Sequence, residues 1–319
     1  MTPPGSLAVL VPAYNEAEVI GEFHRRLAAV LDTLPMRCHV LYVDDGSRDA
    51  TWDLVDALSR TDERVQALRL SRNFGKEAAM TAGLDHIDAD AVVVIDADLQ
   101  DPPELIPALL ERAAQGYDVV YATRARRDGE TWFKRFTSAA FYRTMERLSH
   151  TPVPRDTGDF RLMNRRAVEA VNALRERQRF MKGLFAWIGY RQSSLVYDRD
   201  ARNAGTTKWN YWRLTNLAIE GVTSFSSAPL RVASWLGFAA AMLAFVYAAW
   251  VFLKALLWGD PVRGYPTLMV VILFLGGAQL LAIGLIGEYV GRTYAETKRR
   301  PLYYIEDRRG DVREPPPRD

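Results

Sequence analysis

Short apolar segments recur at roughly even spacing along the first 122 residues, and this pattern constrains the fold more than any other feature. Strands spaced about 25–30 residues apart, with helical stretches between the first four, are typical of βαβ units. Because parallel strands need such crossovers, the sequence predicts an α/β fold with a mostly parallel sheet and flanking helices. The expected strands are Leu7–Val11, His39–Val43, Val65–Leu70, Val92–Ile95 and Asp118–Ala122, and a later strand is expected at Ser194–Tyr197.

Polar residues follow each of the first four strands. Any one block is compatible with turn chemistry, in which Asp, Asn and Gly serve the backbone. Four in succession at the carboxyl edge of a parallel sheet outline a ligand cleft, because open α/β sheets bind ligands there. Neither G-x-G-x-x-G nor G-x-x-x-x-G-K-[ST] is present, which argues against a dinucleotide fold and a P-loop. The blocks are Pro12-Ala-Tyr14-Asn15-Glu16, Asp44-Asp45-Gly46-Ser47, Ser71-Arg72-Asn73-Phe74-Gly75-Lys76 and Asp96-Ala-Asp98-Leu-Gln100.

The fourth block carries the most specific chemistry. Val92–Ile95 does not alternate with polar residues, so this strand is expected to be buried on both faces. Asp96 and Asp98 follow it and could together hold one hard divalent cation, whose other ligands would be waters and substrate phosphates. The alternative is that Asp98 or Asp101 only caps the helix that Pro102-Pro103 opens.

Two long uncharged stretches, Val232–Leu253 and Gly264–Gly287, predict membrane-spanning helices. Each exceeds the roughly 20 residues that cross a bilayer, and core helices are seldom apolar all round for so long. Basic residues flank the pair on the outside, so the positive-inside rule places both termini and the catalytic domain in the cytoplasm of a multi-pass plasma (inner) membrane protein. The flanking residues are Arg213, Arg231, Arg292, Lys298, Arg299 and Arg300.

Composition narrows the compartment and the partners. The first residues have no basic leader, and Leu7–Val11 reads as a strand and not as a signal peptide. The one cysteine, Cys38, excludes an internal disulfide and fits a reducing compartment. A net charge of +2 is too small to indicate a nucleic-acid partner.

The segments VPAYNE, VDDGSRDAT, SRNFGKEAAMTAGL and DADLQDPPE, in this order and spacing, resemble glycosyltransferase family 2, whose catalytic domain has the GT-A fold. The closer resemblance is to polyprenyl-phosphate glycosyltransferases, namely bactoprenol glucosyltransferases and dolichyl-phosphate mannose synthases, and it extends to about residue 300. It implies inverting transfer of one hexose from a nucleotide sugar to a polyprenyl phosphate in the membrane.

The resemblance also implies roles for individual residues. Asp159 is favoured over Asp156 as the catalytic base or orienting carboxylate at the acceptor. Their block lies between an irregular loop and the helix expected from Asn164, and the alternative is that Asp159 caps that helix while Asp156 forms a surface pair with Arg155. Asp45 and Ser47 are expected to hold a turn. Lys76 could equally be surface charge. The metal ligands, holding Mg²⁺ or Mn²⁺, would be Asp96, Asp98 and Gln100. The residues that contact the nucleotide sugar would be Pro12, Tyr14, Glu16, Asp44, Lys76, Asp96, Ala97, Arg202 and Lys208. The residues that contact the acceptor phosphate would be Arg124, Arg135, Arg161 and Arg179.

These features predict four regions. A GT-A-like catalytic domain covers 1–208, and an interfacial helix covers 209–230. A two-helix hairpin covers 231–291, with spans at about 231–257 and 265–288, and a cytoplasmic tail, partly disordered from Leu302, covers 292–319. Glycines at 276, 277, 284 and 287 would allow a homo-oligomer by close helix approach. UDP-glucose is the preferred donor and GDP-mannose the nearest alternative. A non-catalytic membrane scaffold is less favoured, and so is a processive polysaccharide synthase, because the Q-x-x-R-W motif is absent.

Overall fold

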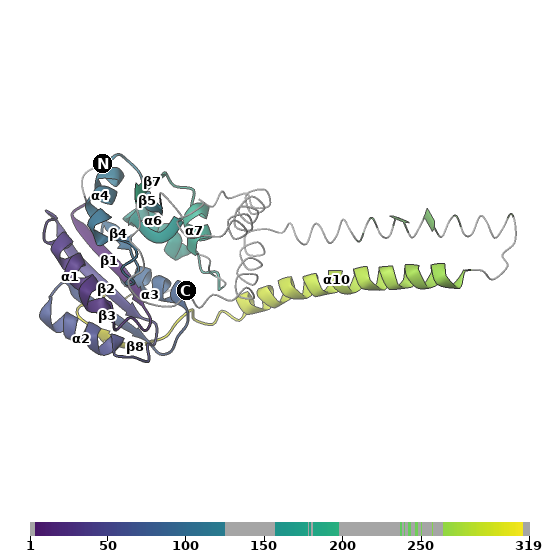
Figure 1. Cartoon of the computed structure of the whole chain (residues 1–319), viewed down its shortest axis with the longest axis horizontal. Coiled ribbons are helices and arrows are strands. Elements are labelled where there is room, and N and C mark those ends of the chain that lie inside the picture. The colour runs from purple at the N-terminus through teal and green to yellow at the C-terminus, as the bar shows by residue number, and fades with distance from the viewer. Residues whose placement is uncertain are drawn as a thin grey trace. The chain divides into compact units, whose positions relative to one another are not determined.

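The computed structural model describes residues 4–124, 157–177, 179, 181–197 and 264–314, together with isolated residues between 237 and 257. These residues fall into two compact units (Figure 1). Unit 1 contains the described residues up to 197 and those from 300 onward. Unit 2 contains the described residues from 237 to 299.

Within its described residues, unit 1 holds an eight-stranded sheet with the order β7-β5-β6-β4-β1-β2-β3-β8. The pairs β1–β2, β1–β4, β2–β3 and β5–β7 are parallel, whereas β3–β8, β4–β6 and β5–β6 are antiparallel. The strands are β1 Ser6–Ala13, β2 Arg37–Asp44, β3 Val65–Leu70, β4 Ala91–Val94, β5 Val119–Arg124, β6 Thr157–Asn164, β7 Gln192–Tyr197 and β8 Ile305–Arg309. The predicted α/β fold with a mostly parallel sheet is confirmed.

Helices cover both faces of this sheet (Figure 1). One face carries α1 (Ile20–Leu31), α2 (Thr51–Thr61) and, after the short 3₁₀ turn η1 (Pro103–Leu105), α4 (Ile106–Ala114); the other carries α3 (Lys76–His86) and α6 (Arg165–Ala173). The short α7 spans Met181–Trp187. Alternation along β1 explains the arrangement, because Leu7, Val9 and Val11 enter the core under α1. Leu10 meets α3 at Gly83, where a Cβ would lie 2.0 Å from Leu10 Cδ1.

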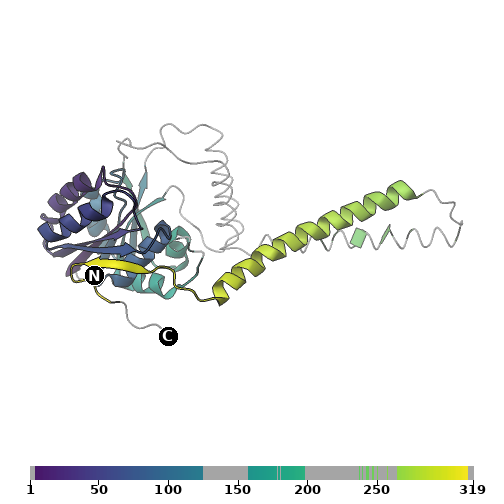
Figure 2. The same ribbon diagram turned by 90° about the horizontal axis from the view of Figure 1, so that it is seen from below.

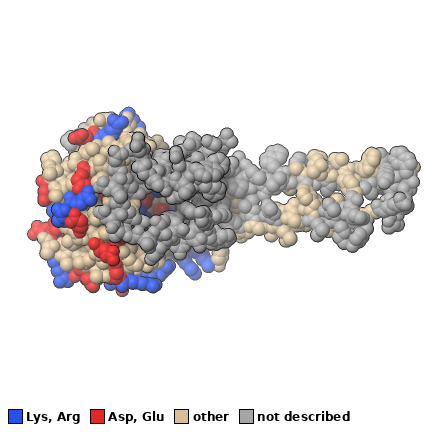
Figure 3. All heavy atoms as spheres, in the orientation of Figure 1, with Lys and Arg blue, Asp and Glu red and all other residues tan. Residues whose placement is uncertain are grey.

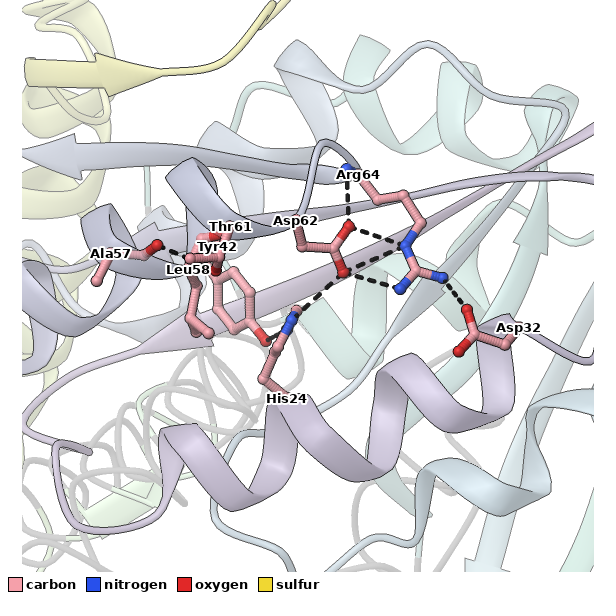
Figure 4. Close-up of polar contacts among 8 residues, drawn as sticks. All are labelled: His24, Asp32, Tyr42, Ala57, Leu58, Thr61, Asp62 and Arg64. Atoms are coloured by element: carbon pink, nitrogen blue, oxygen red, sulfur yellow. Dashed lines mark hydrogen bonds and ion pairs between the residues drawn. The ribbon is translucent and has the colours of Figure 1, made fainter.

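A buried polar network ties α1, β2 and the end of α2 together (Figure 4). His24 Nδ1 lies 3.0 Å from the Tyr42 hydroxyl, and His24 Nε2 lies 3.5 Å from Asp62. Arg64 donates to Asp62 and also reaches Asp32 at 2.7 Å. Burial lowers the pKa of His24, so this imidazole is held neutral among its partners. The network fixes helix positions away from the carboxyl edge of the sheet.

Two strands were not predicted. Residues 157–164, for which no strand was predicted, form β6, which inserts antiparallel between β4 and β5. In the tail, expected to be partly disordered from Leu302, Ile305–Arg309 forms β8 at the edge beside β3, drawn in yellow in Figure 2. Asn164 itself caps α6 by accepting a hydrogen bond from Ala167 N.

In unit 2, α10 runs from Tyr265 to Thr297 and exceeds the predicted span of 265–288. Among the described residues it holds the one stretch long and apolar enough to cross a membrane, Phe274–Thr297. Several of its apolar side chains are exposed, Leu280 at 73%. The predicted interfacial helix and first span lie outside the described residues, apart from isolated helical positions such as Met242 and Leu243.

Candidate active site

The loops after β1 and β2 are joined around the Asp44 carboxylate. Ala13 pairs with Asp44 in the β1–β2 register, and Asp45 N donates to Ala13 O at 2.9 Å. Asp44 is fully buried, and its Oδ1 accepts from Ser47 N at 3.1 Å. Burial raises the pKa of Asp44. Oδ2 is buried without a hydrogen-bond partner among the described residues, and Arg69 Nε lies 3.5 Å from it.

The predicted nucleoside residues of the first block lie at this place. Pro12 is buried in β1, and Tyr14 follows it with 38% of its surface exposed. Asn15 N donates to Ser47 Oγ at 2.9 Å, and Glu16 N donates to Thr51 Oγ1 at 2.9 Å. The structure therefore brings the first and second polar blocks together, as the sequence predicts.

Asp45 holds the loop that leads from β3 into α3. Its carboxylate accepts from Phe74 N at 2.7 Å and from Gly75 N at 2.9 Å. Gly46 next to it has a φ of +67°, and a Cβ there would lie 2.6 Å from the Arg72 carbonyl carbon. The expectation that Asp45 and Ser47 hold the turn is confirmed, and the turn delivers Lys76 to the first position of α3.

Strand β6 explains how Asp159 reaches the acidic block after β4. Val94 pairs with Arg161 in the antiparallel register. Asp96 lies two residues after Val94 and Asp159 lies two residues before Arg161, so the antiparallel register directs both toward the same end of the strands. Lys76 Nζ donates to both, at 2.7 Å from Asp96 and 2.5 Å from Asp159. Residues far apart in the sequence thus form one ion cluster at the carboxyl edge of the sheet.

The electrostatics of this cluster keep Asp159 ionised. Burial would raise its pKa, but the cations Lys76, Lys182 and Arg161 outweigh burial and lower the pKa of Asp159 to about 2. For Lys76, burial opposes the charged form, yet Asp96 and Asp159 raise its pKa above the usual value. Burial and the nearby Asp159 raise the pKa of Glu77 to about 7.

The acidic block offers hard oxygen ligands suited to a divalent cation. Asp98 Oδ1 accepts from Gln100 N at 3.1 Å, which folds the block back on itself, and Gln100 is buried. In the described part of the chain, no group of three or more His, Cys, Asp and Glu side chains is arranged around a common metal position. The Asp96 carboxylate is engaged by Lys76 Nζ at 2.7 Å. A divalent cation at Asp96 and Asp98 would take its other ligands from water and phosphate oxygens.

The predicted phosphate-binding arginines differ in what the structure shows. Arg161 is 3% exposed, donates to the carbonyls of Asp159 and Gly158, and lies 3.9 Å above the Phe185 ring. Burial lowers its pKa to about 10. Arg179 donates to Leu174 O at 2.5 Å, within its own loop. Arg135, Asp156, Arg202, Lys208 and the side chain of Arg124 lie outside the described residues.

Three residues of the site were missed. Glu77 accepts a hydrogen bond from Met181 N at 3.1 Å. The charge of Lys182, the next residue in α7, helps to lower the pKa of Asp159. Arg69, in β3, lies 3.5 Å from Asp44. Glu77 adjoins Lys76 in the sequence and Lys182 lies three residues after Arg179, so a signal existed for both. Arg69 carried none. Figure 3 shows acidic and basic side chains intermingled over the surface of unit 1.

Known proteins resemble this chain along most of its length. Residues 8–171 match the family described as Glycosyl transferase family 2, and residues 228–293 match the one described as GtrB C-terminal hairpin. A Synechocystis sp. glycosyltransferase, described as uncharacterized, is 48% identical over 94% of this chain and 95% of its own. The bactoprenol glucosyl transferase of Shigella phage SfX is 45% identical over 95% of this chain and 99% of its own.

Among solved structures, mannosyl-3-phosphoglycerate synthase from Rubrobacter xylanophilus matches with a TM-score of 0.47 and 21% identity, over 68% of this chain and 72% of that one. The sequence matches are much closer, and two of them cover nearly the full length of both partners. The chain therefore belongs to glycosyl transferase family 2, and it is a glycosyltransferase with the C-terminal hairpin of the GtrB type.

Proposed function

We propose that the protein transfers a single glucose from UDP-glucose to a polyprenyl phosphate, with inversion at the anomeric carbon. The observation that carries this proposal is the cluster of Asp96, Lys76 and Asp159 at the carboxyl edge of the sheet. It lies in a chain that aligns nearly end to end with proteins named bactoprenol glucosyl transferase. The sugar, the metal and the lipid are the proposed part of this assignment.

The nucleoside would lie against Asp44, with Pro12, Tyr14 and Glu16 lining the pocket. The Oδ2 of Asp44 supports this role. It has Arg69 Nε at 3.5 Å but no hydrogen bond among the described residues, and a buried carboxylate oxygen without a hydrogen bond is costly unless a ligand supplies one. Both uracil and guanine present a ring N–H, so Asp44 does not separate UDP-glucose from GDP-mannose. The names of the relatives favour glucose.

The diphosphate would lie over the acidic block. Asp96 and Asp98, with Gln100, would hold Mg²⁺ or Mn²⁺, which when bound would stabilise the charge of the departing nucleoside diphosphate. Arg202 and Lys208 remain proposed contacts to the same phosphates, and Arg124, Arg135, Arg161 and Arg179 to the acceptor.

Asp159 would act at the acceptor by orientation more than by proton removal. A group whose pKa is about 2 is a weak general base at neutral pH. A phosphate monoester is already mostly ionised there, so placing its oxygen against the sugar is the larger requirement. The held position of Asp159 beside Lys76 serves that purpose, and Asp156 remains the second candidate.

The C-terminal hairpin would tether the enzyme to its lipid. We propose a multi-pass plasma membrane protein with the catalytic unit in the cytoplasm. The match to the GtrB hairpin family and the long apolar helix α10 support it. An acceptor that cannot leave the bilayer needs an active site held near the membrane surface.

The test is transfer of label to lipid. Membranes containing the protein are incubated with labelled UDP-glucose or GDP-mannose, with and without EDTA, and extracted with organic solvent. Glucose should enter the organic phase from UDP-glucose, and both EDTA and Asp96→Ala should abolish this transfer. Asp53→Ala, at an exposed position on α2, is the matched control and should keep it. Absence of a sugar lipid from either donor would contradict the proposal. If only a mannose lipid forms, the donor is GDP-mannose and not UDP-glucose.

A further inference from the structure

The segment that follows α10 returns to unit 1 and packs along the edge of its sheet. We name residues 300–314 the C-terminal strap. Its strand β8 pairs with β3, and Tyr304 O accepts from Ser71 N at 2.9 Å (Figure 2). The Tyr303 hydroxyl donates to the buried Asp85 at 2.8 Å. The strap therefore contacts both β3, which contains Arg69, and α3, which begins at Lys76.

Inside this contact, one guanidinium lies between two carboxylates. Arg69 Nε is 3.5 Å from Asp44 Oδ2 and 3.6 Å from Glu306 of the strap. The Trp52 ring supports the group from the side, with its centroid 5.6 Å from the Arg69 guanidinium carbon. Both distances exceed an ordinary charge-assisted hydrogen bond of about 2.7–2.9 Å. Arg69 is therefore shared between Asp44 and Glu306, without a close charge-assisted hydrogen bond from Nε to either carboxylate.

The position of Arg69 decides whether Asp44 can receive a ligand. Among the described residues, Asp44 Oδ2 and Arg69 Nε are both buried without a hydrogen-bond partner. With one of the two carboxylates removed, the guanidinium, on a side chain that is 32% exposed, would move closer to the other, because only one counter-charge then attracts it. Loss of Glu306 would therefore direct Arg69 onto Asp44 Oδ2 and block the oxygen that a nucleobase N–H would use.

We propose that Glu306 is a positioning residue for the nucleotide pocket, acting through Arg69 to keep Asp44 open. This inference rests on the proposed function, in which Asp44 receives the base. It gives the strap a role beyond closing the edge of the sheet. The contacts that attach the strap, such as Tyr303 to Asp85 and Arg309 to Asp56, involve other residues and persist without Glu306.

The first measurement is UDP binding to the full-length protein in detergent, titrated calorimetrically with Mn²⁺ present. Glu306→Ala and Glu306→Gln should each weaken UDP binding by roughly twofold to fivefold, the range of a partly exposed ion pair. The KM for the nucleotide sugar should rise by the same factor, while kcat and the KM for the lipid acceptor stay unchanged. Glu314→Ala is the matched control, since Glu314 is also in the strap, is 83% exposed and pairs with Arg308.

A double-mutant cycle tests whether Glu306 acts through Arg69. In an Arg69→Ala background, Glu306→Ala should produce no further loss of UDP affinity. Wild-type UDP affinity in Glu306→Ala, or in Glu306→Gln, would overturn the proposal. So would a loss that persists in the Arg69→Ala background, or one that comes with a lower melting temperature and a lower kcat.

The proposed function fails in a different way. If the wild-type protein binds neither UDP nor GDP, the nucleotide pocket itself is misassigned, and the role of Glu306 falls with it. If the wild-type protein binds UDP and the Glu306 variants bind it equally well, only the inference about the strap is refuted.

Discussion

Replacing Lys76 with methionine should move the acid limb of the reaction to higher pH. Lys76 Nζ lies 2.5 Å from Asp159 and 2.7 Å from Asp96, and it is the leading cation in lowering the pKa of Asp159 to about 2 from the usual 3.8. Methionine keeps the length of the side chain and removes the charge. Without the Lys76 charge between them, the negative charges of Asp159 and Asp96 would repel each other more strongly.

The size of the shift follows from these values. A change of about two pKa units corresponds to ~2–3 kcal/mol, shared among Lys76, Lys182 and Arg161. Lys76 is 41% exposed, so solvent screening reduces its part to about 1–1.5 kcal/mol, or roughly one unit. The uncompensated charge of Asp96 adds about one more unit. The pKa of Asp159 should therefore rise to roughly 4–5 in the variant.

The assay is kcat/KM for UDP-glucose from pH 4.5 to 8 at constant metal concentration, with the variant divided by the wild type. This ratio removes the titration of the acceptor phosphate, which both proteins share. A carboxylate that must be ionised loses activity as the pH falls through its pKa, so the Lys76→Met ratio should fall below about pH 5. Lys76→Arg keeps the charge and should show a flat ratio. A flat ratio for Lys76→Met, with the fold intact at each pH, would refute the reasoning.

Three further predictions concern stability. Because the pKa of Glu77 is raised, the folded protein keeps a proton between about pH 4.5 and 7 that the unfolded chain has lost, so the free energy of unfolding falls with rising pH in this range. Glu77→Gln should flatten that part of the profile of melting temperature against pH. An unchanged slope would count against this prediction. Gly83→Ala should destabilise by about 1–3 kcal/mol in urea unfolding, because its Cβ would meet Leu10, whereas Gly21→Ala, where the Cβ meets nothing within 4 Å, should not. Asp62→Ala should cost about 1–3 kcal/mol in the same assay by leaving His24 and Arg64 without their shared carboxylate, and equal midpoints would contradict that role.

Local pattern was sufficient for the parts of the protein that depend on neighbours in the sequence. The spacing of apolar runs predicted the parallel core strands, because a crossover helix has a minimum length. The Asp96-Ala-Asp98 block predicted polar chemistry at a strand end, because the carboxyl ends of parallel strands meet at one edge. The uncharged stretch from Gly264 predicted a long apolar helix, because crossing hydrocarbon requires a minimum length.

Tertiary structure alone decided which distant segments pair. Strand β6 is interrupted by Gly158, Asp159 and Arg161, and β8 reads Ile-Glu-Asp-Arg-Arg, so neither has the apolar pattern of a core strand. Both are held by backbone hydrogen bonds, which carry little sequence signal. Yet β6 brings Asp159 opposite Asp96, and β8 brings Glu306 to Arg69. The physical reason is that pairing across the sheet depends on register, which no single segment specifies on its own.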